Sequence, residues 1–254
     1  MSRTAILIDG AFFLKRYKSI YTKPEDQTPE AAAKNLYTMC LSHLKEGRIQ
    51  RRYEVEKQKQ HQNQRNEQKG FSVEHQLYRI FYYDCEPLDK KHHYPISKKA
   101  VDFSKSETAV FRKAFFDCLK EQRKVALRMG HLSEISGWII KPRVQKEIFA
   151  GKRTYESLTD DDFVLEVKQK TVDMKIGLDV ASLTYKKFVD QIILVSGDAD
   201  FLPAAKLARR EGIDFILDPM HKDIPANLSE HIDGKRSTCP RPKPREQKPK
   251  LISA

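Results

Sequence analysis

The stretch ILVSGDADFLPAAKLARREG, residues 193–212, contains an apolar run that stops at two aspartates just before a helix begins. Residues 192–195 are β-branched and leucine residues without polar interruption, which is typical of a parallel strand covered by helices on both faces. Asp198 and Asp200 follow this strand directly, and Pro203 suits the first turn of the next helix. Both carboxylates are therefore predicted at the strand's carboxyl end, where open α/β sheets bind ligands.

A second strand near the start of the chain ends in the same way. The sequence AILIDGAFF, residues 5–13, is an apolar strand followed by Asp9 and Gly10. Aspartate is also a favoured helix cap and turn residue, so each acid taken alone has a structural interpretation. Two buried strands that each end in a carboxylate favour a shared site.

The remaining periodicity predicts alternating strands and helices, and therefore an α/β fold. Further strands are predicted at 77–83, 163–170 and 215–217, and helices at 12–21, 31–44, 106–120, 172–187 and after Pro203, with a short amphipathic piece at 227–232. Residues 125–129 and 138–140 are both candidates for a third strand, and a hairpin-like pairing between them stays open. Residues 89–99 read as a basic loop.

Charge divides the chain into a balanced body and two basic appendages. The formal net charge is +12, of which residues 234–254 contribute +6 and residues 45–69 contribute +4. We predict a polar insertion or helical extension at 45–70 and a disordered basic tail at 234–254, with one domain over 1–233. Basic arms suit a polyanionic partner, although two solvated segments would have the same composition.

The cysteines and the apolar pattern indicate a soluble cytoplasmic protein. The four cysteines have neither the paired spacing of a zinc site nor the density of a secreted scaffold. No signal-like pattern and no run of about 20 apolar residues is present, so we expect no membrane partner. The sequence leaves open whether the chain forms a homo-oligomer.

Three further acids are candidates for the same site. Asp84 follows the strand at 77–83. Asp173 lies in the first turn of a predicted helix, on its apolar face, where it is either a helix-dipole partner or part of a buried polar site. Asp179 has lysines at helical spacing, which favours an exposed, salt-bridged position.

Such a cluster of carboxylates requires a cation. Two carboxylates about 4 Å apart repel by about 4 kcal/mol at an effective dielectric constant near 20. Oxygen ligands without Cys or His select a hard cation, so Mg²⁺ or Mn²⁺ is expected. A cation of this kind supports hydrolysis of phosphodiester bonds.

The motifs ILIDG, KTVDMKIGLD and VSGDADF, in this order, resemble the NYN domain of the PIN-like nuclease superfamily, in its LabA-like bacterial branch. The resemblance runs from about residue 4 to 233 and implies a PIN-like three-layer α/β/α fold with a mainly parallel central sheet. It also implies a Mg²⁺- or Mn²⁺-dependent endoribonuclease with 5′-phosphate and 3′-hydroxyl products. The implied catalytic residues and metal ligands are Asp9, Asp173, Asp198 and Asp200, with Asp84, Asp179 and Ser196 in a second tier.

We expect the partner to be RNA, single-stranded or structured, collected by the two basic appendages. The candidate RNA-binding residues are Arg48, Arg51, Arg52, Lys235, Arg236, Arg241 and Lys243, with Tyr53 available for stacking. One position departs from the family pattern, because many NYN sequences carry Asn three residues after the first Asp and this chain has Phe12.

Two other functions remain open. A non-catalytic RNA-binding or partner-recruiting module would keep the fold and lose the chemistry, and Phe12 favours this alternative. A phosphatase of the haloacid dehalogenase type also carries an aspartate after its first strand, but it requires a second acid two residues later, where this chain has Ala11.

Overall fold

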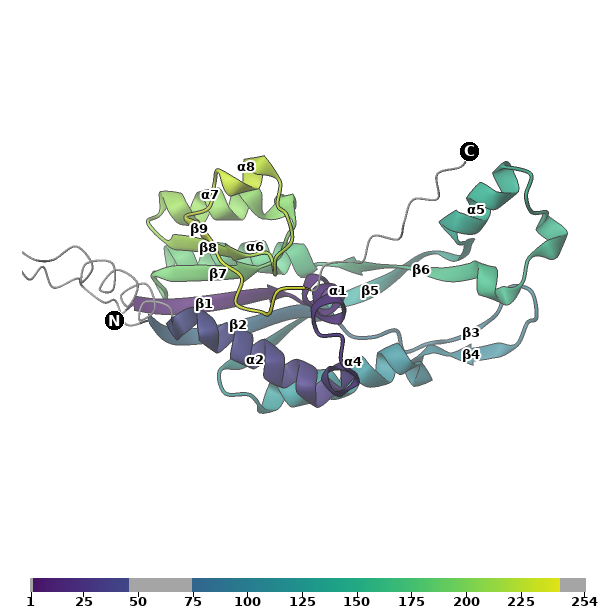
Figure 1. Cartoon of the computed structure of the whole chain (residues 1–254), viewed down its shortest axis with the longest axis horizontal. Helices are drawn as coiled ribbons and strands as arrows, with labels where there is room; N and C mark the ends of the chain where they lie inside the picture. The colour runs from purple at the N-terminus through teal and green to yellow at the C-terminus, as the bar shows by residue number, and fades with distance from the viewer. Residues whose placement is uncertain (1, 46–74, 243–254) are drawn as a thin grey trace, which may run out of the picture.

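The computed structural model describes residues 2–45 and 75–242 as a three-layer α/β/α fold (Figure 1). The strands are β1 Ser2–Asp9, β2 His75–Cys85, β3 Lys91–His93, β4 Ala100–Asp102, β5 Val125–Ile140, β6 Phe163–Lys170, β7 Gln191–Val195, β8 Asp214–Asp218 and β9 Gly234–Lys235. The α-helices are α1 Gly10–Ile20, α2 Pro29–Lys45, α4 Glu107–Glu121, α5 Pro142–Phe149, α6 Val172–Tyr185, α7 Leu202–Arg210 and α8 Ala226–Ser229. The predicted α/β class and mainly parallel sheet are confirmed.

Seven strands form the central sheet, in the order β6-β5-β2-β1-β7-β8-β9. Every neighbouring pair is parallel except β5 with β6. Alternation along β1 divides the core, because Ile6 and Ile8 pack on the face covered by α1, α2 and α4, whereas Ala5 and Leu7 pack on the opposite face with α6 and α7. Both faces are thus closed by helices, as the apolar strands predict.

A long arm extends from the body of the fold (Figure 1). Residues 125–129 and 138–140, the two candidates for a third strand, belong to one 16-residue strand, β5, so the hairpin-like pairing is wrong. The first part of β5 pairs with β2, and the part beyond His131 leaves the body and pairs with β6. The helix α5 lies at the end of this arm, and residues 89–99, predicted as a loop, contribute β3, which pairs with β4.

Residues 234–242 are packed against the body, which differs from the disordered tail predicted for 234–254. Gly234 and Lys235 form β9 beside β8. Arg236 donates from Nε to Nδ1 of His43 at 3.0 Å, and Nε2 of the buried His43 lies 2.9 Å from Asp218. Cys239 is also buried. This segment is held by contacts with α2 and β8, whereas residues 243–254 lie outside the described part of the chain.

Candidate active site

Asp9 and Ser196 stand side by side at the carboxyl edge of the sheet. The strands β1 and β7 are parallel neighbours, and Ile8 is level with Val195, the residue before Ser196. The order of strands reverses at this pair, because β2 and β5 extend from one side of β1 and β8 and β9 continue from β7 on the other. Ligand crevices of open α/β sheets form at such a switch point. The site predicted from the two strand ends therefore lies where the topology favours binding.

Local hydrogen bonds fix the two strand-end aspartates. Asp9 caps α1, with Oδ1 accepting from the backbone N–H of Phe12 at 3.0 Å. Ser196 Oγ donates to Asp9 Oδ2 at 3.4 Å and accepts from the backbone N–H of Asp198 at 3.3 Å. Asp198 Oδ1 in turn accepts from the N–H of Asp200 at 3.0 Å. The capping interpretation thus holds, and Ser196, buried between the two acids, positions both.

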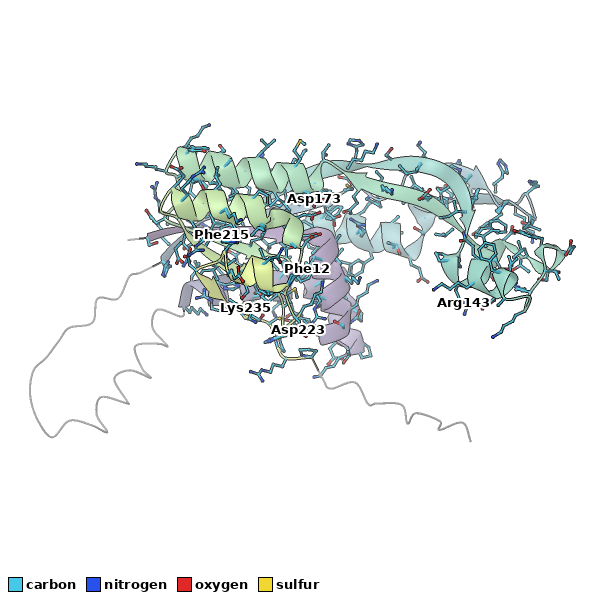
Figure 2. All side chains as sticks on the ribbon, turned by 90° about the horizontal axis from the view of Figure 1, so that it is seen from above. Phe12, Arg143, Asp173, Phe215, Asp223 and Lys235 are labelled. Carbon is cyan, nitrogen blue, oxygen red and sulfur yellow. The ribbon has the colours of Figure 1, made fainter. Side chains whose placement is uncertain are left out.

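The first turn of α6 brings Asp173 to the same edge of the sheet (Figure 2). The preceding Thr171 has a left-handed conformation with φ of 71°, which is strained for a β-branched residue. The buried residues Ile176 and Val180 anchor the helix, while Asp173 itself is exposed. Strain of this kind is frequent beside functional sites.

The four acids Asp9, Asp173, Asp198 and Asp200, here called the aspartate cluster, influence one another electrostatically. Burial raises the pKa of Asp9, and the charge of Asp173 raises it further. Partial desolvation by neighbouring groups raises the pKa of the exposed Asp173, with added contributions from the charges of Asp198 and Asp200. Within residues 2–45 and 75–242, no member of the cluster forms an ion pair with Lys, Arg or His. The cluster therefore lacks a compensating cation from the described chain.

Asp84, by contrast, is neutralised by the protein. Its fully buried carboxylate pairs with Arg112 and accepts hydrogen bonds from Gln169 Nε2 at 3.0 Å and from the N–H of Cys85 at 2.8 Å. The hydroxyl of Tyr82 donates to the other oxygen at 3.2 Å. Both carboxylate oxygens of Asp84 thus have partners within the protein, and its second-tier place in the site stays a prediction.

Asp179 is also paired, as its lysine-rich surroundings suggested, although its partner is an arginine. Its Oδ2 lies 3.1 Å from Arg128 Nε and accepts from the hydroxyl of Tyr83 at 2.8 Å. Burial raises the pKa of Tyr83, which keeps this hydroxyl protonated and able to donate. These bonds indicate a structural role for Asp179.

We therefore expect Asp179→Asn to lower the free energy of unfolding by about 1 kcal/mol or less and to leave RNA cleavage within about threefold of wild type. The ion pair is partly exposed, since the Arg128 side chain is 46% accessible, so its loss is screened by solvent. Urea unfolding and a cleavage assay measure the two effects. The matched variant on the same helix is Asp173→Asn, and equal losses of activity in both variants would contradict this division of roles.

A cavity of about 340 Å³ opens beside Asp9 and Asp198. Lys15 and Lys222 also line it, and neither was predicted as a site residue. Phe12 packs against Gly197, where a Cβ atom would come within 2.8 Å of the phenyl ring, and the ammonium group of Lys222 lies 5.8 Å from the ring centroid. Carboxylates for a cation and ammonium groups for an anion therefore share one cavity.

The carboxylates of the aspartate cluster fit a hard divalent cation that keeps several water ligands. Among the described residues, no three His, Cys, Asp or Glu side chains are arranged to hold a metal ion together. Mg²⁺ retains several waters and is commonly bound through one or two carboxylates together with substrate phosphates, so a complete protein cage is not required. Oxygen-only donors, raised pKa values and missing ion pairs agree with this mode of binding.

The predicted RNA-binding residues fall into two groups. Arg48, Arg51, Arg52, Lys243 and Tyr53 lie outside the described residues, as does the predicted insertion at 45–70 except Lys45, the last residue of α2. Lys235 and Arg241 are exposed on the packed segment. Arg236 donates to the backbone oxygen of His43 at 2.6 Å as well as to its ring, so the structure gives it a structural role.

The family comparison agrees with this fold. A family model for the NYN domain matches residues 81–230, more than half of the chain. The chain therefore belongs to the NYN domain family, within the PIN-like nuclease superfamily. The match includes Asp173, Asp198 and Asp200, whereas Asp9 comes from β1, before the matched residues.

Two individual proteins are also similar to this chain. The chain is 28% identical over 104 residues to "Uncharacterized protein MJ0482" of Methanocaldococcus jannaschii, a match that covers 40% of this chain and 43% of that protein. The chain thus spans less than half the length of this relative. A crystal structure of "a protein of unknown function VPA0982" from Vibrio parahaemolyticus covers 92% of this chain and 91% of its own, at 13% identity and a TM-score of 0.38, which is too low to support an argument.

In the described part of the chain, none of the helices has both the length and the apolar composition needed to span a bilayer.

Proposed function

We propose that this protein is a divalent-metal-dependent endoribonuclease that hydrolyses RNA phosphodiester bonds at the aspartate cluster. The observation that carries the proposal is the contrast among the acids at one sheet edge. Asp84 and Asp179 are paired with arginines, while Asp9, Asp173, Asp198 and Asp200 have no ion pair among the described residues. Unpaired carboxylates at a topological switch point favour a cation as their partner.

A bound Mg²⁺ or Mn²⁺ would neutralise charge on a phosphoryl oxygen and lower the pKa of water. Asp9, Asp173 and Asp198 would hold the ion, directly or through water, while Asp200 would orient the attacking water or complete a second cation site. Ser196 positions Asp9 and Asp198 relative to each other through its hydrogen bonds. Lys15 and Lys222, in the same cavity, would bind the phosphate.

The experiment that tests the proposal is a cleavage assay on end-labelled RNA with Mn²⁺, with Mg²⁺ and with a chelator. We expect metal-dependent products with 5′-phosphate and 3′-hydroxyl ends. Metal-independent cleavage, or no cleavage by folded protein with either ion, would contradict the assignment. Phosphate release from small phosphomonoesters would instead support the phosphatase alternative, which lacks its second acid because Ala11 occupies that position.

A non-catalytic RNA-binding module is the second candidate. Two observations favour it: Phe12 stands where many NYN sequences have Asn, and no three-ligand set is preformed among the described residues. RNA binding without metal-dependent cleavage would support this alternative over the nuclease.

A truncation tests the basic tail. Removing residues 243–254 deletes four Lys/Arg and one acid, while the packed segment and its bonds to His43 remain. We expect weaker RNA binding for all sequences, and a slope of log affinity against log salt that flattens by about 0.7 for each phosphate that the tail no longer neutralises. Affinity measured over a salt series checks this, and an unchanged slope would show that these residues do not bind phosphate.

A further inference from the structure

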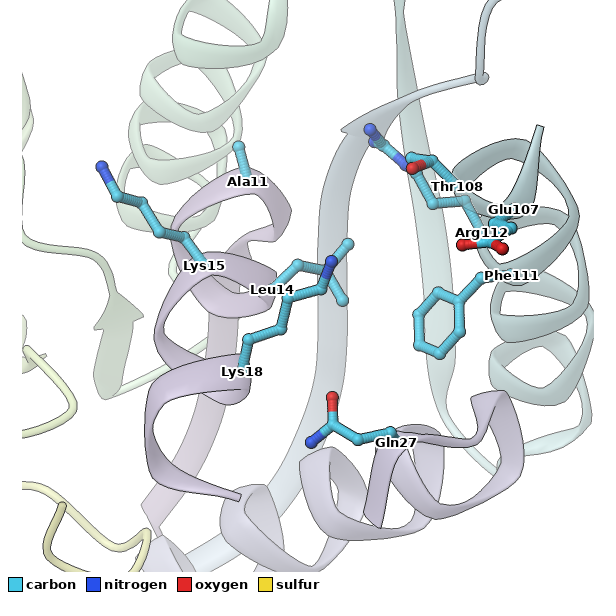
Figure 3. Close-up of a pocket in the computed structure, with 9 residues that line it drawn as sticks. All are labelled: Ala11, Leu14, Lys15, Lys18, Gln27, Glu107, Thr108, Phe111 and Arg112. Atoms are coloured by element: carbon cyan, nitrogen blue, oxygen red, sulfur yellow. The ribbon is translucent and has the colours of Figure 1, made fainter. Parts of the chain in front are cut away.

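A second cavity, of about 450 Å³, lies between α1 and α4, next to the aspartate cluster (Figure 3). Its volume is within the range of small-ligand pockets. We name it the α1/α4 groove; its lining residues are Ala11, Leu14, Lys15, Lys18, Gln27, Glu107, Thr108, Phe111 and Arg112. Ala11 and Lys15 also line the cavity beside Asp9 and Asp198, so the two spaces adjoin along α1.

The charge of the groove suits a phosphate chain. Three cationic side chains, Lys15, Lys18 and Arg112, line it together with one acid, Glu107. Arg112 is matched by Asp84, whereas Lys15 and Lys18 on α1 are both exposed. Lys18 extends from α1 toward the groove, whereas the ammonium end of Lys15 points away from α4 (Figure 3). Lys18 therefore offers the groove a positive charge for a phosphate.

An aromatic side chain on the opposite wall completes the site. The ring of Phe111 projects from α4 into the groove (Figure 3) and is only half-buried. It is held by stacking on Phe115, with centroids 6.1 Å apart and 14° between planes, and Phe115 stacks in the same way on Phe13. A ring fixed by its neighbours, with a side facing a basic groove, is a platform on which a nucleobase can stack.

We propose that the α1/α4 groove binds an unpaired nucleotide of the RNA substrate, its base on Phe111 and its phosphate on Lys18, beside the phosphate that the aspartate cluster and Lys15 would bind. The inference rests on the proposed function and specifies its substrate as single-stranded. A base within a duplex is stacked on its neighbours and cannot use the ring, whereas an unpaired base can turn its face to it. The groove therefore selects single strands through stacking and backbone charge.

Binding is measured with short single-stranded RNA in chelator, in the Asp198→Asn background, so that cleavage and metal affect no result. We expect Phe111→Leu to weaken binding by about fivefold or more, the lower end for one stacked base. Lys18→Ala should flatten the salt slope by about 0.7. The matched controls are Phe149→Leu, an exposed phenylalanine on the arm, and Lys34→Ala, an exposed lysine on α2, and neither should change binding.

A second measurement changes the RNA as well as the protein. A set of RNAs, each with one abasic position, should contain one that binds more weakly to protein with Phe111, and this difference should vanish with Phe111→Leu. Equal affinity for single-stranded and duplex RNA, or no abasic effect, would overturn the inference. If wild type still cleaves RNA with metal, either outcome rejects the groove inference and leaves the nuclease proposal intact. If stacking is observed but wild type does not cleave RNA, the nuclease proposal is rejected and RNA binding in the groove remains.

Discussion

Replacing Asp9 or Asp198 by asparagine is expected to lower the rate of Mn²⁺-dependent RNA cleavage by about 100-fold or more. Asparagine keeps a side-chain oxygen for the N–H groups of Phe12 and Asp200, so the local caps remain. Only the negative charge is removed, and with it several kcal/mol of stabilisation that a cation would supply to the transition state. Initial rates on labelled RNA at saturating Mn²⁺ measure the effect.

The control is Asp161→Asn, which removes one exposed carboxylate from the arm. Lys141 donates a hydrogen bond to the backbone oxygen of Asp161, so replacing the Asp161 side chain leaves this bond in place. We expect this variant to cleave at the wild-type rate. Folded Asp9→Asn and Asp198→Asn proteins that also cleave at the wild-type rate would remove the aspartate cluster from the chemistry.

Local patterns predicted the strand-end aspartates because each follows a short, fully apolar run. The second-tier acids Asp84 and Asp179 have arginine partners far away in the chain. Asp84 ends a buried strand as Asp9 does, but Arg112, 28 residues later, neutralises it, and no local pattern reveals that pair. Lys222 comes from a distant part of the chain, and only the fold brings it to the cavity beside Asp9. Lys15 could have been predicted from the sequence, because it lies one helical turn after Ala11 on the helix that follows Asp9.

Two differences from the predicted layout have the same physical origin. The middle of β5 is polar because the strand leaves the core there, so it lacks the apolar run that marks a buried strand. Residues 234–242 have the basic, proline-containing composition of a tail, yet Arg236 bonds to His43 across 193 residues and Cys239 is buried. Composition reports the average environment of a segment and cannot report a specific long-range contact.

The pH dependence of stability without metal follows from the raised pKa of Asp173. A carboxyl group whose pKa is higher in the folded state contributes to the free energy of unfolding. This contribution is fully present below the unfolded pKa of about 3.9 and is lost as the pH rises through the folded pKa. Asp173→Asn should therefore raise the melting temperature in chelator more at pH 7 than at pH 4. A gain that is independent of pH over this range would contradict the repulsion argument.

Thermal melts should show the strongest separation between a shared cation site and separate structural roles for the four aspartates. At Mn²⁺ concentrations of about 100 times the dissociation constant, wild type should gain about 2.7 kcal/mol, which corresponds to a rise in melting temperature of about 5–10 °C. Asp198→Asn should lose most of this rise, because a cation stabilises the fold only by binding the native cluster. In chelator the same variant should melt slightly higher than wild type, since it removes charge that raises the pKa of Asp173.

A purely structural role for Asp198 predicts the opposite pattern. Its Oδ1 accepts from the N–H of Asp200, and if this cap were its whole contribution, asparagine would leave stability in chelator unchanged or lower and would not alter the response to Mn²⁺. Asp179→Asn provides the internal comparison, because its carboxylate is already paired with Arg128 and should not affect the metal-induced rise. An Asp198→Asn protein that melts lower in chelator and keeps the full Mn²⁺ shift would rule out the shared site.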